Sequence, residues 1–323
     1  MTVTETLTDV TDPALLDEEQ RSDKYDALVA RLNRQSVDKH FQAYVDIDWD
    51  APEMQIDPAD PRWELPDDVA LGATEWYRSQ PQEVRAAMGL HRIVDNMKTG
   101  LQFENILKRG LLDFAGTLPN GSAEFRYLYH EVIEEAQHGL MFQEFVNRSG
   151  LDPRGIDPGG QVLSRGGGLG GRLFPELFFI FVLGGEDPID HVQRQALRGD
   201  RELHPLLERI MRIHVTEEAR HLSFARQFLK QRVGALGLAK RAALALGAPV
   251  TLGVMADMMM KPSPGLLRRF EVPADVVRAA YKEDPGHRQA TLEALSKVRR
   301  LCDELGIITP ASRPLWKALG IWS

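Results

Sequence analysis

The sequence predicts an all-α protein built around a bundle of four long helices, and three observations lead to this fold class. Apolar residues recur every three or four positions over 83–114, 123–148 and 200–233, which is the spacing of amphipathic helices. The stretch 173–183 is apolar nearly all round, so we expect it to be a central helix. No strand pattern, phosphate-binding glycine loop or long internal repeat accompanies them.

The composition narrows the class of protein. The chain has 323 residues, 43% of them apolar, which allows a sizeable core. A formal net charge of −8 without a long Lys/Arg run argues against nucleic acid or an anionic membrane as the main partner. The single cysteine, Cys302, excludes an internal disulfide, and the polar, acidic N-terminus does not resemble a signal peptide. We therefore expect a cytoplasmic protein.

The chain up to residue 66 is expected to lead into the bundle. Residues 1–19 have the Thr, Asp and Glu bias of a flexible acidic tail. A helical period begins near Tyr25. The proline-rich segment 40–66 has no sustained period, so we expect it to wrap over the bundle in an extended form.

The first bundle helix, 83–114, carries a glutamate in an apolar setting. Glu104 is flanked by apolar residues, and Gly100 one turn earlier leaves space beside its carboxylate. A buried carboxylate needs a compensating charge. A metal ion would supply that charge, and an ion pair with Arg92 or Lys108 is the alternative.

The second bundle helix carries the first of two Glu-x-x-His pairs. Glu135 and His138, three residues apart, share one helical face. Glu134 precedes them and is a candidate to accept a hydrogen bond from the ring nitrogen of a ligand histidine that does not bind metal. Glu131, one turn earlier, is a candidate to hydrogen-bond near the metal or to line a substrate pocket, with an ion pair to Arg126 or a neighbour as the alternative.

The third bundle helix, which we expect to begin near Arg172, has an acid after its apolar run. Glu186 follows Gly184 and Gly185, and these two glycines would let substrate or oxygen approach closely. The alternative is a plain helix end, since Pro188 disfavours helix at the residue before it. The glycine-rich stretch before this helix, up to Gly171, is either a connection or a mobile lid.

The fourth bundle helix presents three donors on one face. His214, Glu218 and His221 fall within an arc of about 60° if the segment is helical. Glu217 stands beside this second pair as Glu134 stands beside the first. Beyond it, we expect further helices and no new ligand cluster, and we interpret the apolar but interrupted stretch 242–260 as a buried helix pair or a kinked core helix rather than a membrane span.

Together these donors predict a dimetal site. Two Glu-x-x-His helices, each complemented by a lone glutamate from a further helix, form the carboxylate site of ferritin-like four-helix bundles. We predict a single ferritin-like domain over 20–323, with its bundle core at about 83–233 and C-terminal helices at 235–323. The predicted metal ligands are Glu104, Glu135, His138, Glu186, His214, Glu218 and His221.

The order of these ligands resembles the AurF-type family of non-haem diiron N-oxygenases, which is typified by p-aminobenzoate N-oxygenase. The shared pattern is a lone Glu, a Glu-x-x-His, a second lone Glu and a final His-x-x-x-Glu-x-x-His, in which His214 is the distinguishing extra histidine. The resemblance covers roughly 37–230, including the acidic stretch 46–50. It implies two iron ions, the first served by Glu104, Glu135 and His138 and the second by Glu186, His214, Glu218 and His221.

The resemblance also implies an activity. The protein would activate O2 at two iron ions, with manganese as an alternative metal, and N-oxygenate an amine such as an aryl amine through a peroxo-diiron intermediate. The seven ligands would be catalytic through the metals, the protein would be a homodimer, and the sequence does not identify the electron donor. A diiron hydroxylase or desaturase acting on an aliphatic or acyl substrate is the alternative, followed by a ferroxidase or iron-storage protein.

The substrate pocket is expected one or two turns from the ligands. A negative charge from Glu131 in that pocket would disfavour a carboxylate-bearing aromatic such as aminobenzoate and would suit a cationic or neutral amine. The candidate pocket residues are Met97, Gly100, Leu101, Val182, Leu183, Gly184, Gly185 and Met211.

Overall fold

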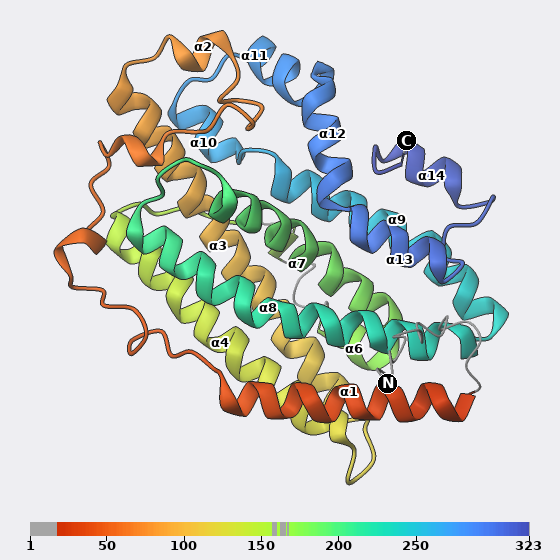
Figure 1. Cartoon of the computed structure of the whole chain (residues 1–323). Coiled ribbons are helices and arrows are strands. Elements are labelled where there is room, and N and C mark those ends of the chain that lie inside the picture. The colour runs from red at the N-terminus through yellow and green to blue at the C-terminus, as the bar shows by residue number, and fades with distance from the viewer. Residues whose placement is uncertain (1–17, 157–159, 162–165, 167, 323) are drawn as a thin grey trace, which may run out of the picture.

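The computed structural model describes residues 18–156, 160–161, 166 and 168–322, and over these residues the protein is helical without strands, which confirms the predicted fold class (Figure 1). Single helical turns of the 3-10 type lie at Pro52–Met54, Pro61–Trp63 and Val233–Ala235, and a π-helical turn spans Ala279–Glu283. The α-helices are α1 (Glu18–Asp38), α2 (Glu75–Arg78), α3 (Gln82–Ala115), α4 (Ala123–Ser149), α6 (Leu169–Leu173), α7 (Pro175–Arg198), α8 (Pro205–Arg232), α9 (Leu238–Met260), α10 (Pro264–Arg269), α11 (Ala274–Arg278), α12 (Pro285–Ala294), α13 (Ser296–Glu304) and α14 (Arg313–Ala318).

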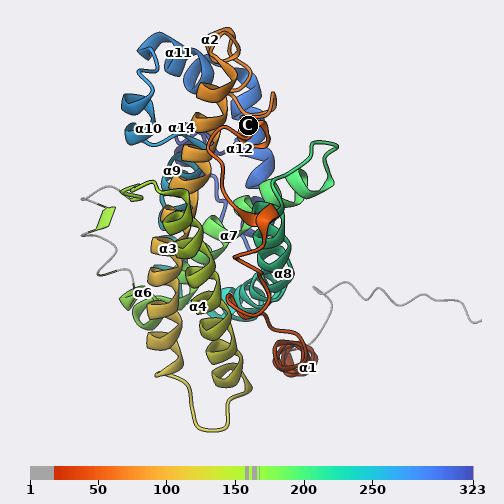
Figure 2. The same ribbon diagram turned by 90° about the vertical axis from the view of Figure 1, so that its left-hand side faces the viewer.

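Helices α3, α4, α7 and α8 form the four-helix bundle. Helices α3 and α4 run side by side and are joined by a tight connection at one end of the molecule, while α7 and α8 form the second pair (Figure 2). Helix α1 crosses α4 and α8 near one end of the bundle, and α9 packs along α7. The apolar faces of these helices enclose the core, in which Phe179, Phe224 and Phe228 pack ring against ring.

Two predicted segments lie partly outside the described residues. Residues 1–17 of the predicted tail lie outside the described residues, and residues 18 and 19 belong to α1. In the glycine-rich stretch after α4, the residues outside the description are 157–159, 162–165 and 167.

The third bundle helix does not end at its glycine pair, because α7 continues through Pro188 to Arg198. A proline within a helix removes one N–H donor, and its ring crowds the carbonyl group four residues earlier. Here that residue is Gly184, which has no side chain. The continuous helix holds Glu186 in the middle of the bundle, where its carboxyl group is only 3% exposed.

Helix α9 is a single continuous helix that contains Gly247 and Pro249. The stretch Leu238–Arg269, which comprises α9 and α10, is long and apolar enough to cross a membrane by length and composition alone. Within its most apolar window 44% of the residues are buried inside the fold. Core helices of soluble proteins share these properties, so they do not establish a membrane span.

The segment between α1 and α2 wraps along one side of the bundle (Figure 1). Its main chain is anchored by side chains of the bundle: the Phe41 N–H donates to Glu217 Oε1 at 3.0 Å, and the Ala43 N–H donates to Gln137 Oε1 at 2.9 Å. Further along, the Trp63 ring stacks on His204 with 4.3 Å between ring centroids. This segment therefore reaches the same region of α4 and α8 that carries the Glu-x-x-His pairs.

Candidate metal centre

The four bundle helices bring all seven predicted ligands together in the interior. Each is at most 3% exposed. Their donor atoms form three overlapping groups, within each of which the atoms lie no more than 4.8 Å apart. These groups are Glu104, His138 and His214; Glu135, Glu218 and His221; and Glu186, His214 and Glu218.

Two carboxylates, Glu135 from α4 and Glu218 from α8, lie between the two histidines of the paired motifs. His221 Nδ1 is 3.0 Å from Glu135 Oε1 and 3.1 Å from Glu218 Oε1. His138 Nδ1 is 3.4 Å from Glu135 Oε2 and 3.6 Å from Glu218 Oε1. Each carboxylate is therefore placed to serve both halves of a two-ion site.

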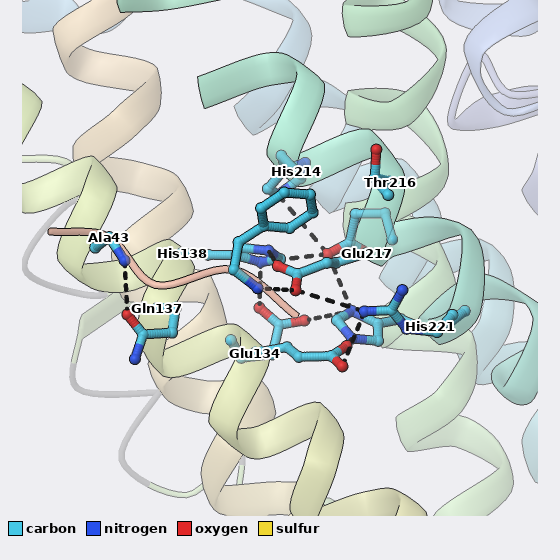
Figure 3. Close-up of polar contacts among 12 residues, drawn as sticks. Ala43, Glu134, Gln137, His138, His214, Thr216, Glu217 and His221 are labelled. Carbon is cyan, nitrogen blue, oxygen red and sulfur yellow. Dashed lines mark hydrogen bonds and ion pairs between the residues drawn. The ribbon is translucent and has the colours of Figure 1, made fainter. Parts of the chain in front are cut away.

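On the side away from the cluster, each of these two histidines forms a hydrogen bond with a glutamate of the opposite helix. His138 Nε2 on α4 is 2.8 Å from Glu217 Oε2 on α8, and His221 Nε2 on α8 is 2.7 Å from Glu134 Oε2 on α4 (Figure 3). Because an ionised carboxylate only accepts hydrogen bonds, each Nε2 carries the proton, and each Nδ1 faces the cluster.

A buried guanidinium links these two outer acids. Arg220 Nη2 is 2.9 Å from Glu134 Oε1 and 3.5 Å from Glu217 Oε1. Hydrogen bonds with His221 and Arg220 outweigh the effect of burial and lower the pKa of Glu134. Both acids are thus compensated by cationic or N–H groups and are not free to bind a metal themselves.

The third histidine is oriented by an amide. His214 Nδ1 is 2.9 Å from Gln193 Oε1, so Nδ1 donates and Nε2 keeps its lone pair. That Nε2 lies 4.0 Å from Glu104 Oε1 and 3.8 Å from Glu218 Oε1. Burial and the neighbouring His138 lower the pKa of His214 well below its usual range, so the ring is neutral, as a metal-binding imidazole must be.

The carboxylates of the cluster fit a cationic partner. Both oxygens of Glu104 and Glu135, one oxygen of Glu218 and His138 Nδ1 are buried with no hydrogen-bond partner among the described residues. Burial and neighbouring carboxylates raise the pKa of Glu104 and Glu186 well above the usual range. Four carboxylates and three imidazoles would balance two divalent cations, and this donor set suits iron or manganese.

Of the two alternative partners of Glu104, Lys108 reaches it only at the outer limit of an ion pair, and Arg92 bonds elsewhere. Lys108 Nζ lies 4.0 Å from Glu104 Oε2, beyond hydrogen-bond distance, and donates instead to the main-chain oxygen of Glu135 at 2.9 Å. The Arg92 guanidinium donates to the main-chain oxygens of Met259 and Lys261. Neither cation neutralises Glu104 through a direct hydrogen bond.

Glu131 is buried beside the cluster but belongs to none of the three groups. It is 0% exposed, and neither carboxyl oxygen has a hydrogen-bond partner among the described residues. Burial raises its pKa to about 8. Of the alternatives left open for Glu131, a place in the substrate pocket is not found, because the residue does not line the cavity described next, and among the described residues no ion pair joins it to Arg126.

An apolar cavity of about 120 Å³ lies against the cluster, where Glu104, Glu186 and His214 form part of its wall. Of the predicted pocket residues, four line it: Met97, Gly100, Gly185 and Met211. Residues of α9 that the sequence did not indicate also line it: Met255, Met258 and Met259. The remaining lining includes Gln193, which holds His214, and Val192 at a 42% exposed position.

The other four predicted pocket residues do not line the cavity. Val182 and Leu183 are completely buried in the core on another side of α7. Gly184 faces α9, where an added Cβ would lie 2.9 Å from Leu252 Cδ2. Leu101 packs toward α4 instead, with its Cδ1 3.1 Å from the position of a Cβ at Gly139.

The chain is similar to known proteins over most of its length. Residues 22–306 match the family model described as p-aminobenzoate N-oxygenase AurF. An uncharacterized protein of Mycobacterium tuberculosis (strain ATCC 25618 / H37Rv) is 38% identical over 294 residues, which cover 91% of this chain and 86% of the relative. An uncharacterized protein of Mycobacterium bovis shows the same identity and coverage. The family match extends beyond the 37–230 region that carried the resemblance.

Proposed function

The chain belongs to the p-aminobenzoate N-oxygenase AurF family, and from this premise we propose that it is an oxygen-activating enzyme that uses two iron ions to N-oxygenate an amine. The observation that carries the proposal is the convergence of four carboxylates and three imidazoles from four helices at one buried point. Two iron ions bound there would activate O2 for transfer of an oxygen atom. Manganese is the alternative metal for these donors.

In this proposal the seven converging side chains hold the ions, and other residues fix their directions. Glu135 and Glu218 lie between both histidines of the paired motifs, so they are the proposed shared ligands. Glu134 and Glu217 hold the two Nε2 protons, which keeps each Nδ1 directed at the cluster. Such supporting acids raise the basicity of ligand histidines and fix their tautomers.

The position of the cavity supports amine oxygenation. His214 and two of the proposed ligand carboxylates form one wall, so a bound amine can place its nitrogen beside the cluster and donate its N–H groups to acceptors there. Inserting one oxygen atom into an N–H bond consumes one O2, two electrons from an external donor and two protons, and it releases one water molecule. The apolar remainder of the wall excludes bulk water from this step.

Anaerobic loading with ferrous iron tests the proposal. We expect about two iron ions per chain by mass spectrometric metal analysis, and after addition of ¹⁸O2 and an aryl amine we expect ¹⁸O on the nitrogen of the product. The Glu218→Ala variant removes a central carboxylate and should lose most of the iron. The Glu208→Ala variant, on the outer part of the same helix, should retain it. Protein that binds no iron would contradict the proposal, and ¹⁸O found on carbon would favour the hydroxylase alternative.

A further inference from the structure

The residues that line the cavity beside the cluster indicate which kind of substrate the cavity admits. Beyond the metal centre, its wall is almost entirely apolar, and its polar members are Asn96, Thr99 and Gln193. Asn96 is exposed and Thr99 is half-buried, while Gln193 is engaged with His214. We propose that the substrate is a compact, uncharged aromatic amine whose ring bears no carboxylate. The amine part of this inference rests on the proposed function.

The charge of the lining argues against an acidic substrate. Among the described residues, no lysine or arginine lines the cavity, and its ionisable members include two carboxyl groups, Glu104 and Glu186. With its amine at the cluster, the substrate would hold a para carboxylate at the apolar end of the cavity, where the carboxylate would lose its water shell without gaining a lysine or arginine partner. Glu131 does not line the cavity and therefore places no charge in it.

Three cations close in sequence to the lining residues of α3 are committed to other partners. Arg92 is bonded to main-chain oxygens at the end of α9. Lys98 Nζ donates to Gln143 Oε1 at 2.9 Å, and Lys108 donates to the main chain of α4. Releasing any of them for a substrate carboxylate would leave a carbonyl or amide oxygen without its donor.

The side chains of the wall favour an aromatic ring. Five methionines line the cavity, and their flexible, polarizable thioethers make favourable contacts with ring edges. Phe103 and Phe142 add aromatic faces. The five are Met97, Met211, Met255, Met258 and Met259.

The size of the cavity limits the substrate to about one ring. Its volume of about 120 Å³ is close to that of an engineered apolar cavity of about 150 Å³ that admits benzene. Longer apolar substituents would extend toward Val192, which is 42% exposed at the edge of the lining. The specificity is thus set by charge and by ring size together.

A matched pair of ligands tests the inference without turnover. We would load the full-length protein with Zn²⁺ in place of iron and measure binding of 4-methylaniline and 4-aminobenzoate by isothermal titration calorimetry at neutral pH. The two share the ring and the amine and differ only in the para group. We expect 4-methylaniline to bind at least about tenfold more tightly, since an unpaired buried carboxylate costs more than 1.4 kcal/mol. Equal binding, tighter binding of 4-aminobenzoate, or binding of neither ligand would overturn the inference.

A variant with a new positive charge in the cavity wall provides a second test of the substrate preference. The Val192→Lys variant places an ammonium group at the edge of the cavity, and we expect it to narrow the preference for 4-methylaniline by about threefold or more. The Leu112→Lys variant is the control, because Leu112 is also 42% exposed but lies on α3 away from the lining. Circular dichroism and metal content would establish that both variants fold. An unchanged preference in a folded Val192→Lys protein would count against the inference.

The same ligands keep this inference separate from the proposed function. If 4-methylaniline binds preferentially but iron-loaded protein does not N-oxygenate it, the proposed function fails and the substrate preference stands. If iron-loaded protein N-oxygenates 4-aminobenzoate in preference to 4-methylaniline, the preference fails and the proposed function stands.

Discussion

The two Glu-x-x-His helices differ most at a single equivalent position, the residue four before each paired glutamate. On α8 this residue is His214, and on α4 it is Glu131. Both are buried beside the same cluster, and burial favours the neutral form of each: it lowers the pKa of His214 and raises the pKa of Glu131 to about 8. Their surroundings nevertheless give them different roles.

His214 stands on the side of the cluster that faces the cavity, whereas Glu131 does not reach it. Gln193 orients the imidazole, but nothing among the described residues hydrogen-bonds to the Glu131 carboxyl group. A repeated sequence motif therefore does not produce a symmetric site. The neighbouring helices decide which copy of the motif extends the donor set and which one carries a protonated acid.

The largest effect is expected from the loss of the His214 side chain. The His214→Ala variant loses the neutral donor between Glu104 and Glu218, and because a direct ligand matters more than a residue that supports one, we expect more than about 100-fold weaker binding of one of the two metal ions. Metal analysis after dialysis, together with N-oxygenation assays, measures the effect. A Thr216→Ala variant, at a half-buried position two residues along the same helix and outside the cluster, is the control. Full iron content and full activity in His214→Ala would remove the argument for a role of the third histidine.

An intermediate effect is expected from the acids that hold the paired histidines across the helices. In the Glu217→Gln and Glu134→Gln variants the Nε2 proton loses its charged acceptor, and we expect metal affinity or activity to fall by about 10- to 100-fold. Competition with a metal chelator measures this affinity. Gln137→Leu, which alters α4 without touching either histidine, should stay within about twofold of the native protein. If metal affinity in the two acid variants stayed as close to the native value as in Gln137→Leu, the hydrogen bonds between α4 and α8 would have no influence on metal binding.

The smallest effect is expected for Glu131, the residue of α4 that corresponds to His214, in the metal-free protein. Because the folded-state pKa of Glu131 is about 8, the folded protein retains a proton that the unfolded chain has lost at neutral pH, so stability falls as pH rises from about 4.5 to about 8. Glu131→Gln cannot ionise and should be more stable than the native protein by about 1–3 kcal/mol at pH 9. At pH 4 the two should be nearly equal. Urea denaturation at both pH values measures the free energy of unfolding of the two proteins. The same difference between them at pH 4 and at pH 9 would contradict the prediction.

The sequence predicted the long bundle helices to within a few residues because their apolar periods are local signals. For example, the span 123–148 became α4, Ala123–Ser149. The convergence of Glu104 and Glu186 on the paired motifs also followed from a local feature, since isolated acids among apolar residues need a partner. The alternative of a helix end after Gly184 and Gly185 was wrong, because the structure accommodates Pro188 within the helix.

Contacts between distant segments could not be predicted in the same way. Glu134 and His138 lie four residues apart on one helix, yet Glu134 bonds to His221 of α8, and only the packing of α4 against α8 determines that choice. The methionines of α9 that line the cavity gave no directional signal, because that helix is apolar on most of its surface. Val182 was misassigned for the same reason, since an apolar run does not indicate which side faces a cavity.

The hydrogen bond between the segment that follows α1 and helix α8 limits when the metal site can form during synthesis. The Phe41 amide and its acceptor Glu217 are separated by 176 residues. At a synthesis rate of about 5–20 residues per second, the amide emerges from the ribosome roughly 10–35 s before its partner. All four donor helices must also be present before the ions can be enclosed. The seven donor side chains can therefore meet only after translation has passed α8.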